Sequence, residues 1–97
     1  MELLIFYIYN IFMKFEYYPK GVCSTKYTLD INDEDVIDSL TIENGCPGNT
    51  MGISKIVVGM KVDDVIEDFE GIDCRGRGTS CPDQIAHALK AYKLQKA

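Results

Sequence analysis

Lys26-Tyr27-Thr28-Leu29-Asp30-Ile31 alternates polar and apolar side chains, which is the two-residue period of a strand with one buried face. The side chains that this period turns toward a core are Tyr27, Leu29 and Ile31. The alternation returns over residues 36–43, after the acidic turn Asn32-Asp33-Glu34-Asp35. Residues 14–18 can form a further short strand, closed by Pro19. These runs predict a meander of three antiparallel strands.

The remainder of the chain has the 3.6-residue period of helices. Asn49 is a suitable N-cap for a first helix, which Gly59 ends. The third helix begins at Ser80 or Cys81, because Ser80 and Asp83 form a capping-box-like pair. The apolar positions of the first helix are Met51, Ile53, Ile56 and Val57, those of a second helix are Val62, Val65, Ile66 and Phe69, and those of the third are Ile85, Ala86, Leu89 and Tyr92.

Strands therefore come first and helices after, without an internal repeat or a flexible linker. This order predicts the α+β class: a small antiparallel three-stranded sheet followed by three helices packed on one of its faces. A chain of 97 residues with 46% hydrophobic content fits one small domain. Its 15 acidic residues against 10 basic ones disfavour direct binding to nucleic acid or to anionic membranes, which needs a basic face.

The first twelve residues form an apolar run that is too short to cross a bilayer as a helix. The run has no basic start and no small-residue cleavage site, so it does not read as a secretion signal. We expect residues 1–12 to be an extension from an upstream start site, with Met13 as the working start, or an extra edge strand rich in Tyr and Ile. Without an export signal, the cytoplasm is the expected location.

The four cysteines all lie in turn-forming sequence, among Gly, Pro, Ser and Thr. They are Cys23, Cys46, Cys74 and Cys81. A cysteine that serves as a small hydrophobe belongs inside a strand or on the apolar stripe of a helix, and these do not. In a reducing compartment a disulfide framework is the weaker interpretation. The position of the thiols favours a metal site, zinc or an iron–sulfur cluster, with thiol redox or nucleophilic chemistry and unligated thiols as the alternatives.

Cys46 directly precedes one predicted helix and Cys81 opens another. A helix start presents unpaired N–H groups and a partial positive charge, which favour a thiolate, and thiolates are what metals bind. In a packing of three strands and three helices, all four cysteines can converge on one end of the sheet. The chain has no Cys-x-x-Cys pair, so spacing alone is a weak signal for a zinc ribbon.

Other conspicuous residues have simpler interpretations. His87 falls on the polar side of the last helix and is expected to be a solvated side chain rather than a ligand. Arg75-Gly76-Arg77-Gly78 can hold a phosphate or can be a flexible connector, and we favour the connector. Ser24 and Lys55 are expected to be neutral neighbours of the site, so that Ser24→Ala and Lys55→Ala should change little.

Three segments carry a resemblance to a known family: residues 17–24 around Cys23, residues 44–49 around Cys46, and Thr79-Ser80-Cys81-Pro82-Asp83 with Gln84. The chain resembles stand-alone proteins of the TSCPD domain family, named for residues 79–83, and the resemblance covers residues 13–97. A related domain ends the adenosylcobalamin-dependent ribonucleotide reductases. The resemblance thus implies docking on a larger reductase or another protein partner. Family members carry a ribonucleotide reductase label, but this chain is too short for that catalysis alone.

A more distant resemblance is to iron–sulfur scaffold proteins of the NifU and SufU type, whose cysteines open a strand, precede a helix and start the last helix. Cys23, Cys46 and Cys81 fall on those positions. The scaffold family has Asp two residues after its first cysteine, where this chain has Thr25, and Cys74 is then expected to supply the fourth contact. A fully thiolate shell is better suited to holding a metal than to handing it on.

The function that follows is a small metal-binding accessory domain, with Cys23, Cys46, Cys74 and Cys81 around zinc or an iron–sulfur cluster, linked to ribonucleotide reduction. An iron–sulfur scaffold is one alternative. Another is a thiol electron donor in which Cys74 and Cys81 form a dithiol, because the short Gly-rich loop between them allows pairing.

Overall fold

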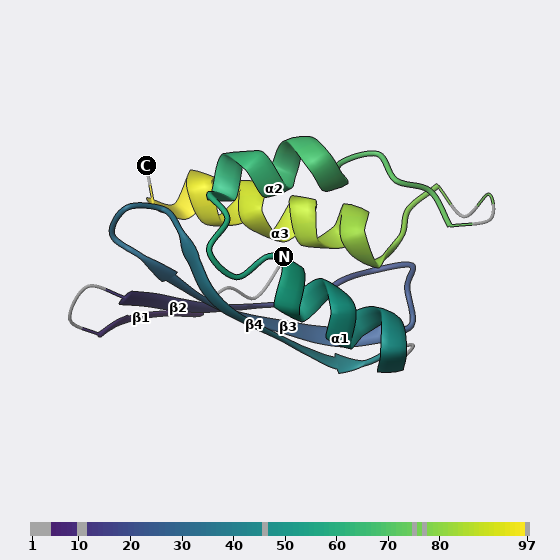
Figure 1. Cartoon of the computed structure of the whole chain (residues 1–97), viewed down its shortest axis with the longest axis horizontal. Helices are drawn as coiled ribbons and strands as arrows, with labels where there is room; N and C mark the ends of the chain where they lie inside the picture. Colours follow the sequence, from purple (N-terminus) through teal and green to yellow (C-terminus); the bar gives the residue numbers. More distant parts are fainter. Residues whose placement is uncertain (1–4, 10–11, 46, 75, 77, 97) are drawn as a thin grey trace.

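In the computed structural model, which describes residues 5–9, 12–45, 47–74, 76 and 78–96, four strands precede three helices. The strands are β1 (Ile5–Tyr9), β2 (Phe12–Tyr17), β3 (Ser24–Asn32) and β4 (Ile37–Asn44), and the helices are α1 (Pro47–Ile56), α2 (Val62–Phe69) and α3 (Cys81–Lys96). The helices cover one face of the sheet (Figure 1). This arrangement confirms the predicted α+β class.

The sheet is antiparallel, with strand order β1-β2-β3-β4. β2, β3 and β4 are the predicted three-stranded meander. β1 pairs with β2 as a fourth strand at the edge of the sheet, and the interpretation of residues 1–12 as an extension from an upstream start site or an extra edge strand stays a prediction. The predicted inward side chains of β3 are fully buried: Tyr27, Leu29 and Ile31.

The first helix departs from the prediction at its start. α1 begins at Pro47, so Asn49 lies inside its first turn and is not the N-cap. Proline is tolerated at the first position of a helix because its missing N–H has no partner there. Ile53 and Val57 are buried as expected, but Met51 is 61% exposed. Ile56 is 67% exposed, so the apolar stripe of α1 is narrower than the sequence pattern indicated.

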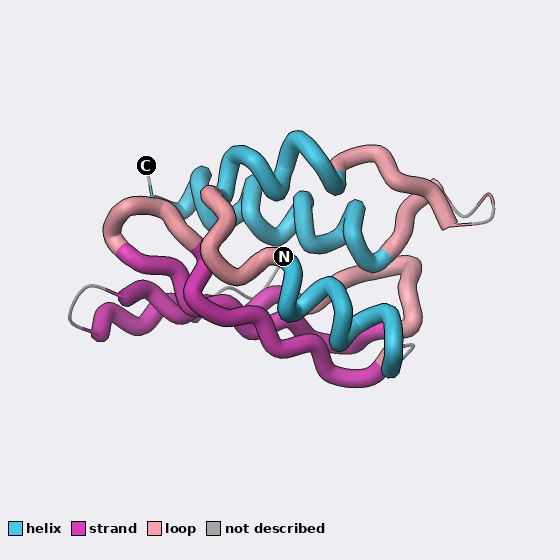
Figure 2. Tube along the Cα trace, in the orientation of Figure 1, coloured by secondary structure: helices cyan, strands magenta, loops and turns pink. Residues whose placement is uncertain are grey.

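The second and third helices match their predicted stripes. α2 runs from Val62 to Phe69, and α3 lies between α2 and the sheet (Figure 2). The buried residues that these helices give to the core are Val62, Val65, Ile85, Ala88, Leu89 and Tyr92. Tyr92 stacks on Phe15 of β2, with ring centroids 5.2 Å apart, and so joins the last helix to the sheet. Each fully buried side chain of this size stabilises the fold by about 1.5–3 kcal/mol.

A β-bulge interrupts β3 near its start. The pairing with β4 shifts register between Ser24 and Lys26. Because side chains alternate along a strand, one extra residue turns those before it to the opposite face. Ser24 and Tyr27 are consequently both buried, whereas Thr25 between them is exposed. The bulge therefore places a serine hydroxyl on the helix-covered side at this end of the sheet.

Among the described residues, no helix is long and apolar enough to cross a membrane.

Candidate functional site: the cysteine end of the sheet

The structure places three of the four predicted ligands in or beside loops that meet the sheet at one end. Cys81 is the first residue of α3 and is half-buried. Cys23 directly precedes β3 and is exposed, and Cys74 is exposed in the loop between α2 and α3. Cys46 lies outside the described residues; its neighbour Gly45 is described. We call the described residues of three segments, 20–24, 44–45 and 71–81 without 75 and 77, the cysteine end.

Short contacts hold these loops together. Ser24 Oγ lies 3.4 Å from Cys81 Sγ, which joins the start of β3 to the start of α3. A Cβ on Gly45 would lie 3.4 Å from Ser24 Cβ, so the segment entering Cys46 passes close to the same serine. The Cys74 amide donates to the Thr79 carbonyl at 3.0 Å, which brings the outer loop back toward α3. The backbone thus gathers all three loops at one end of the sheet.

Within the described part of the chain, no group of three His, Cys, Asp or Glu side chains is close enough to hold a metal ion. The donor chemistry still fits one, because soft thiolates are the ligands that zinc and iron–sulfur clusters select. The described thiols come from two loops, since Cys23 precedes β3 whereas Cys74 and Cys81 share the loop that leads into α3. The four-cysteine ligand set stays a prediction.

The segment Thr79–Asp83 is fixed by side-chain hydrogen bonds that also build the start of α3. Ser80 Oγ accepts the Asp83 amide at 3.1 Å and donates to the Ile72 carbonyl at 2.7 Å. Ser80 is therefore the N-cap, as the capping pair predicted. Thr79 Oγ1 donates to Asp83 Oδ2 at 2.6 Å and accepts from Gln84 Nε2 at 2.9 Å. These bonds fix Cys81 at the helix start.

Asp83 is buried, and its carboxylate joins the loop between α2 and α3 to the start of α3. Besides Thr79, it accepts the Gly71 amide at 2.7 Å and lies 3.2 Å from His87 Nε2. Burial by itself would raise the pKa of the Asp83 carboxyl. The hydrogen bonds from Thr79 and Gly71, together with the charge of His87, outweigh burial and lower that pKa. Asp83 thus closes the loop between α2 and α3 over the helix start.

Ser24 is the residue that the sequence interpretation missed. It was expected to be a neutral neighbour, but it is 3% exposed and contacts both Cys81 and Tyr27. Its Oγ lies 2.9 Å from the Tyr27 hydroxyl, which also donates to the Cys81 carbonyl at 3.3 Å. Burial is the main cause that raises the pKa of Tyr27, so this phenol keeps its proton. Simple alternation could not find this contact, since the bulge reverses the face of Ser24.

The remaining sequence candidates have structural roles or lie outside the described residues. His87 is exposed, as expected, and pairs with Asp83 four residues earlier on α3. Arg75 and Arg77 are not among the described residues, so the connector interpretation of their loop stays a prediction. Asp73 accepts the Gly76 amide at 2.6 Å, and also the Gly78 amide, which shapes the turn beyond Cys74.

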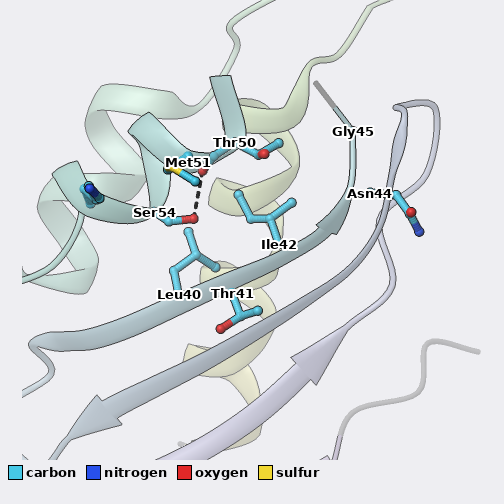
Figure 3. A pocket seen from close by; sticks show the side chains of 9 residues that line it. Leu40, Thr41, Ile42, Asn44, Gly45, Thr50, Met51 and Ser54 are labelled. Carbon is cyan, nitrogen blue, oxygen red and sulfur yellow. Dashed lines mark hydrogen bonds between the residues drawn. The ribbon is translucent and has the colours of Figure 1, made fainter. Parts of the chain in front are cut away.

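A hollow of about 450 Å³ lies between β4 and α1, beside the cysteine end. Leu40 and Ile42 of β4 face Met51 of α1 across it (Figure 3). Gly45, which leads to Cys46, lines the end of this hollow. An open apolar surface therefore borders the loop that carries one of the predicted ligands.

The fold and the residues of the cysteine end define a small α+β domain whose signature segment opens its last helix. The family model of the TSCPD domain matches residues 12–93, and this chain belongs to that family. No curated protein and no solved structure matches the chain.

Proposed function

We propose that this protein is a small metal-binding accessory domain in which Cys23, Cys46, Cys74 and Cys81 hold zinc or an iron–sulfur cluster. The observation that carries the proposal is the meeting of the cysteine loops at one end of the sheet. Cysteines that served only as small hydrophobes would lie in the core, whereas Cys23 and Cys74 are exposed. When bound, the metal would add a further link between the segments that carry the cysteines.

The residues around Cys81 support this role. Cys81 is the first residue of α3 and lies beside the unpaired backbone N–H groups of the helix start. The bonds of Ser80 and Asp83 hold this helix start rigidly before any ligand arrives. A preformed ligand position lowers the ordering cost of metal binding.

Anaerobic purification followed by metal analysis, sulfide analysis and a visible spectrum tests the proposal. Because the unfolded chain cannot hold four cysteines together, metal binding is linked to folding. We expect Cys46→Ser and Cys81→Ser to lose metal and to lower the free energy of unfolding together, by about 4 kcal/mol at a thousandfold excess over the dissociation constant. Lys55→Ala is the matched control, since Lys55 is exposed on α1.

Two results would contradict the four-cysteine site. One is a folded, metal-free protein whose four cysteines all react at once with a thiol reagent. The other is a Cys46→Ser variant that melts like the wild type and keeps its full metal content.

A thiol electron donor is the second candidate. The hydrogen bond from the Cys74 amide to the Thr79 carbonyl keeps Cys74 near the start of α3, where Cys81 lies. In this function two thiols lose two electrons and two protons to an acceptor and form one disulfide. A reversible two-electron couple that is lost in both Cys74→Ser and Cys81→Ser supports it. If both variants keep the wild-type couple, the dithiol is excluded.

The link to ribonucleotide reduction rests on the resemblance to the domain that ends the cobalamin-dependent reductases. As an accessory domain, the protein would dock on a larger enzyme through apolar surface. Met51 and Ile56, more than half exposed on α1, offer such surface beside the hollow. An iron–sulfur scaffold is the further alternative. Thr25 stands where scaffolds have Asp, and its hydroxyl bonds to the Glu43 carbonyl and to Asn44.

A further inference from the structure

Ser24 and Tyr27 form a buried pair of hydroxyls that ends on the sulfur of Cys81. The distances are 2.9 Å from Tyr27 Oη to Ser24 Oγ and 3.4 Å from Ser24 Oγ to Cys81 Sγ. Ser24 is 3% exposed and Tyr27 is fully buried, so water does not compete for these atoms. A buried hydroxyl must find its hydrogen-bond partners within the protein. The direction of each hydrogen bond here therefore depends on how many protons and how many acceptors the group contains.

The count favours donation toward sulfur when Cys81 is a thiolate. A thiolate and a carbonyl oxygen have no proton to donate, so the two hydroxyl protons are the only donors in the group. If Ser24 donates to Cys81 Sγ, the Tyr27 proton still has an acceptor in the Cys81 carbonyl, so both hydroxyl protons are used. If Ser24 donates to Tyr27 instead, the charged sulfur loses its donor from the interior.

We propose that Ser24 is a positioning residue for the metal site, donating a hydrogen bond to the metal-bound sulfur of Cys81 while Tyr27 holds the serine in place. This inference rests on the proposed metal-binding function. Hydrogen bonds from outside the ligand shell orient the ligands and stabilise the charge they carry. Their loss weakens metal affinity by about 10–100-fold.

Cobalt(II) binding to the reduced, metal-free full chain, read by its visible spectrum and by competition with a chelator, tests this. A hydrogen bond lowers the energy of the sulfur lone pair, so its loss should move the sulfur-to-cobalt charge-transfer band to lower energy. We expect Ser24→Ala to show this shift with affinity reduced about 10–100-fold. Thr25→Ala, the matched control, removes a neighbouring exposed hydroxyl that does not reach the sulfur and should change neither property.

Tyr27→Phe keeps the buried ring and removes the hydroxyl that holds Ser24. The charge-transfer band of Tyr27→Phe should also move to lower energy, by a smaller amount than in Ser24→Ala. If Ser24→Ala does not fold, Tyr27→Phe alone tests the inference. The inference is wrong if the folded variants keep the charge-transfer band at its wild-type position. This holds even if their cobalt affinity falls, because a purely structural role of Ser24 would change affinity alone. A wild-type protein that binds no cobalt overturns the metal site and this inference with it.

Discussion

The two ends of the sheet are closed by different kinds of contact. At the end that carries the β3–β4 turn, the Val62 amide donates to the Asp35 carbonyl at 2.9 Å and the Ile37 amide donates to the Met60 carbonyl at 2.9 Å. The Tyr92 hydroxyl donates to Asp35 Oδ1 at 2.9 Å. We call this the turn end. It adjoins the core, where α2 and α3 cover the sheet.

At the cysteine end, buried polar side chains supply the hydrogen bonds that join segments, whereas backbone groups make two of the three bonds named at the turn end. Ser24, Ser80 and Asp83 are each buried and each joins two or more segments by hydrogen bonds. Such bonds fix geometry, and because water is displaced in forming them each contributes only about 0.5–1.5 kcal/mol net, or about 1.5–3 kcal/mol where one partner is charged. The apolar core therefore contributes the larger share of stability, while the side-chain hydrogen bonds of the cysteine end fix the geometry that the proposed metal site would need.

Removing apolar volume from the core should have the largest effect on stability. Leu89 is fully buried in α3 against the sheet, and Leu89→Ala leaves a cavity there. We expect the free energy of unfolding to fall by about 2–5 kcal/mol, measured by urea denaturation. Leu94→Ala on the same helix is the control, since Leu94 is 80% exposed and its loss should cost within about 0.5 kcal/mol.

A Leu89→Ala variant as stable as Leu94→Ala would mean that α3 is held by the cysteine end. The cysteine end, rather than the core, would then contribute more to the stability of the fold.

Asp83→Asn should have the next largest effect, and the effect should depend on pH. The carboxylate is buried with hydrogen bonds from Thr79 and Gly71, and bonds to a charged group contribute about 1.5–3 kcal/mol. The folded pKa of Asp83 is lowered, so its contribution is complete above the unfolded value of about 3.9 and is lost as the pH falls through the folded value. Wild type and Asp83→Asn should therefore converge in stability at low pH.

Denaturation midpoints of both proteins between pH 7 and pH 2 measure this convergence. Asp63→Asn, an exposed carboxyl of α2, is the control and should show no such change in the difference. If the difference in stability between wild type and Asp83→Asn stays constant as the pH falls, the ionised carboxylate does not close the loop between α2 and α3.

The parts of the fold that the sequence predicted are those set by periodicity. The inward faces of β3, α2 and α3 follow from apolar spacing, because burial of those side chains drives folding. The first helix was predicted less well. Asn49 is a good cap by type, but α1 begins at Pro47, and the exposure of Met51 and Ile56 depends on how α1 lies against β4. That packing is a tertiary property, which local spacing does not contain.

The sequence predicted which loops carry the cysteines, but it did not predict the side-chain contacts that hold these loops. Turn-forming neighbours identified the loops that carry the cysteines, and the capping pair identified Ser80 as the start of α3. The role of Ser24 could not be predicted, because a bulge reverses its face and its partner Cys81 is 57 residues away. The role of Asp83 in closing the loop could not be predicted either, because its carboxylate accepts a hydrogen bond from the Gly71 amide, which belongs to a different segment of the chain.

Tyr92→Phe should have the smallest effect and tests the turn end itself. The change keeps the buried ring and its stacking on Phe15, and removes the hydroxyl that donates to Asp35. A net loss of about 0.5–1.5 kcal/mol in the free energy of unfolding is expected. The half-buried Asp35 carboxylate can regain water, which limits the loss. Tyr18→Phe, on a 41% exposed side chain, is the control for urea denaturation.

The same variant separates the two ends of the sheet. Asp35 and Tyr92 belong to the turn end, so Tyr92→Phe should leave cobalt affinity and the charge-transfer band of the cysteine end at their wild-type values. The two ends lie at different positions along α3, and effects of separated sites without shared partners add within about 0.5 kcal/mol. A shift of the cobalt band in Tyr92→Phe would show that α3 transmits a displacement along its length, and the ends would then have to be treated as one coupled unit.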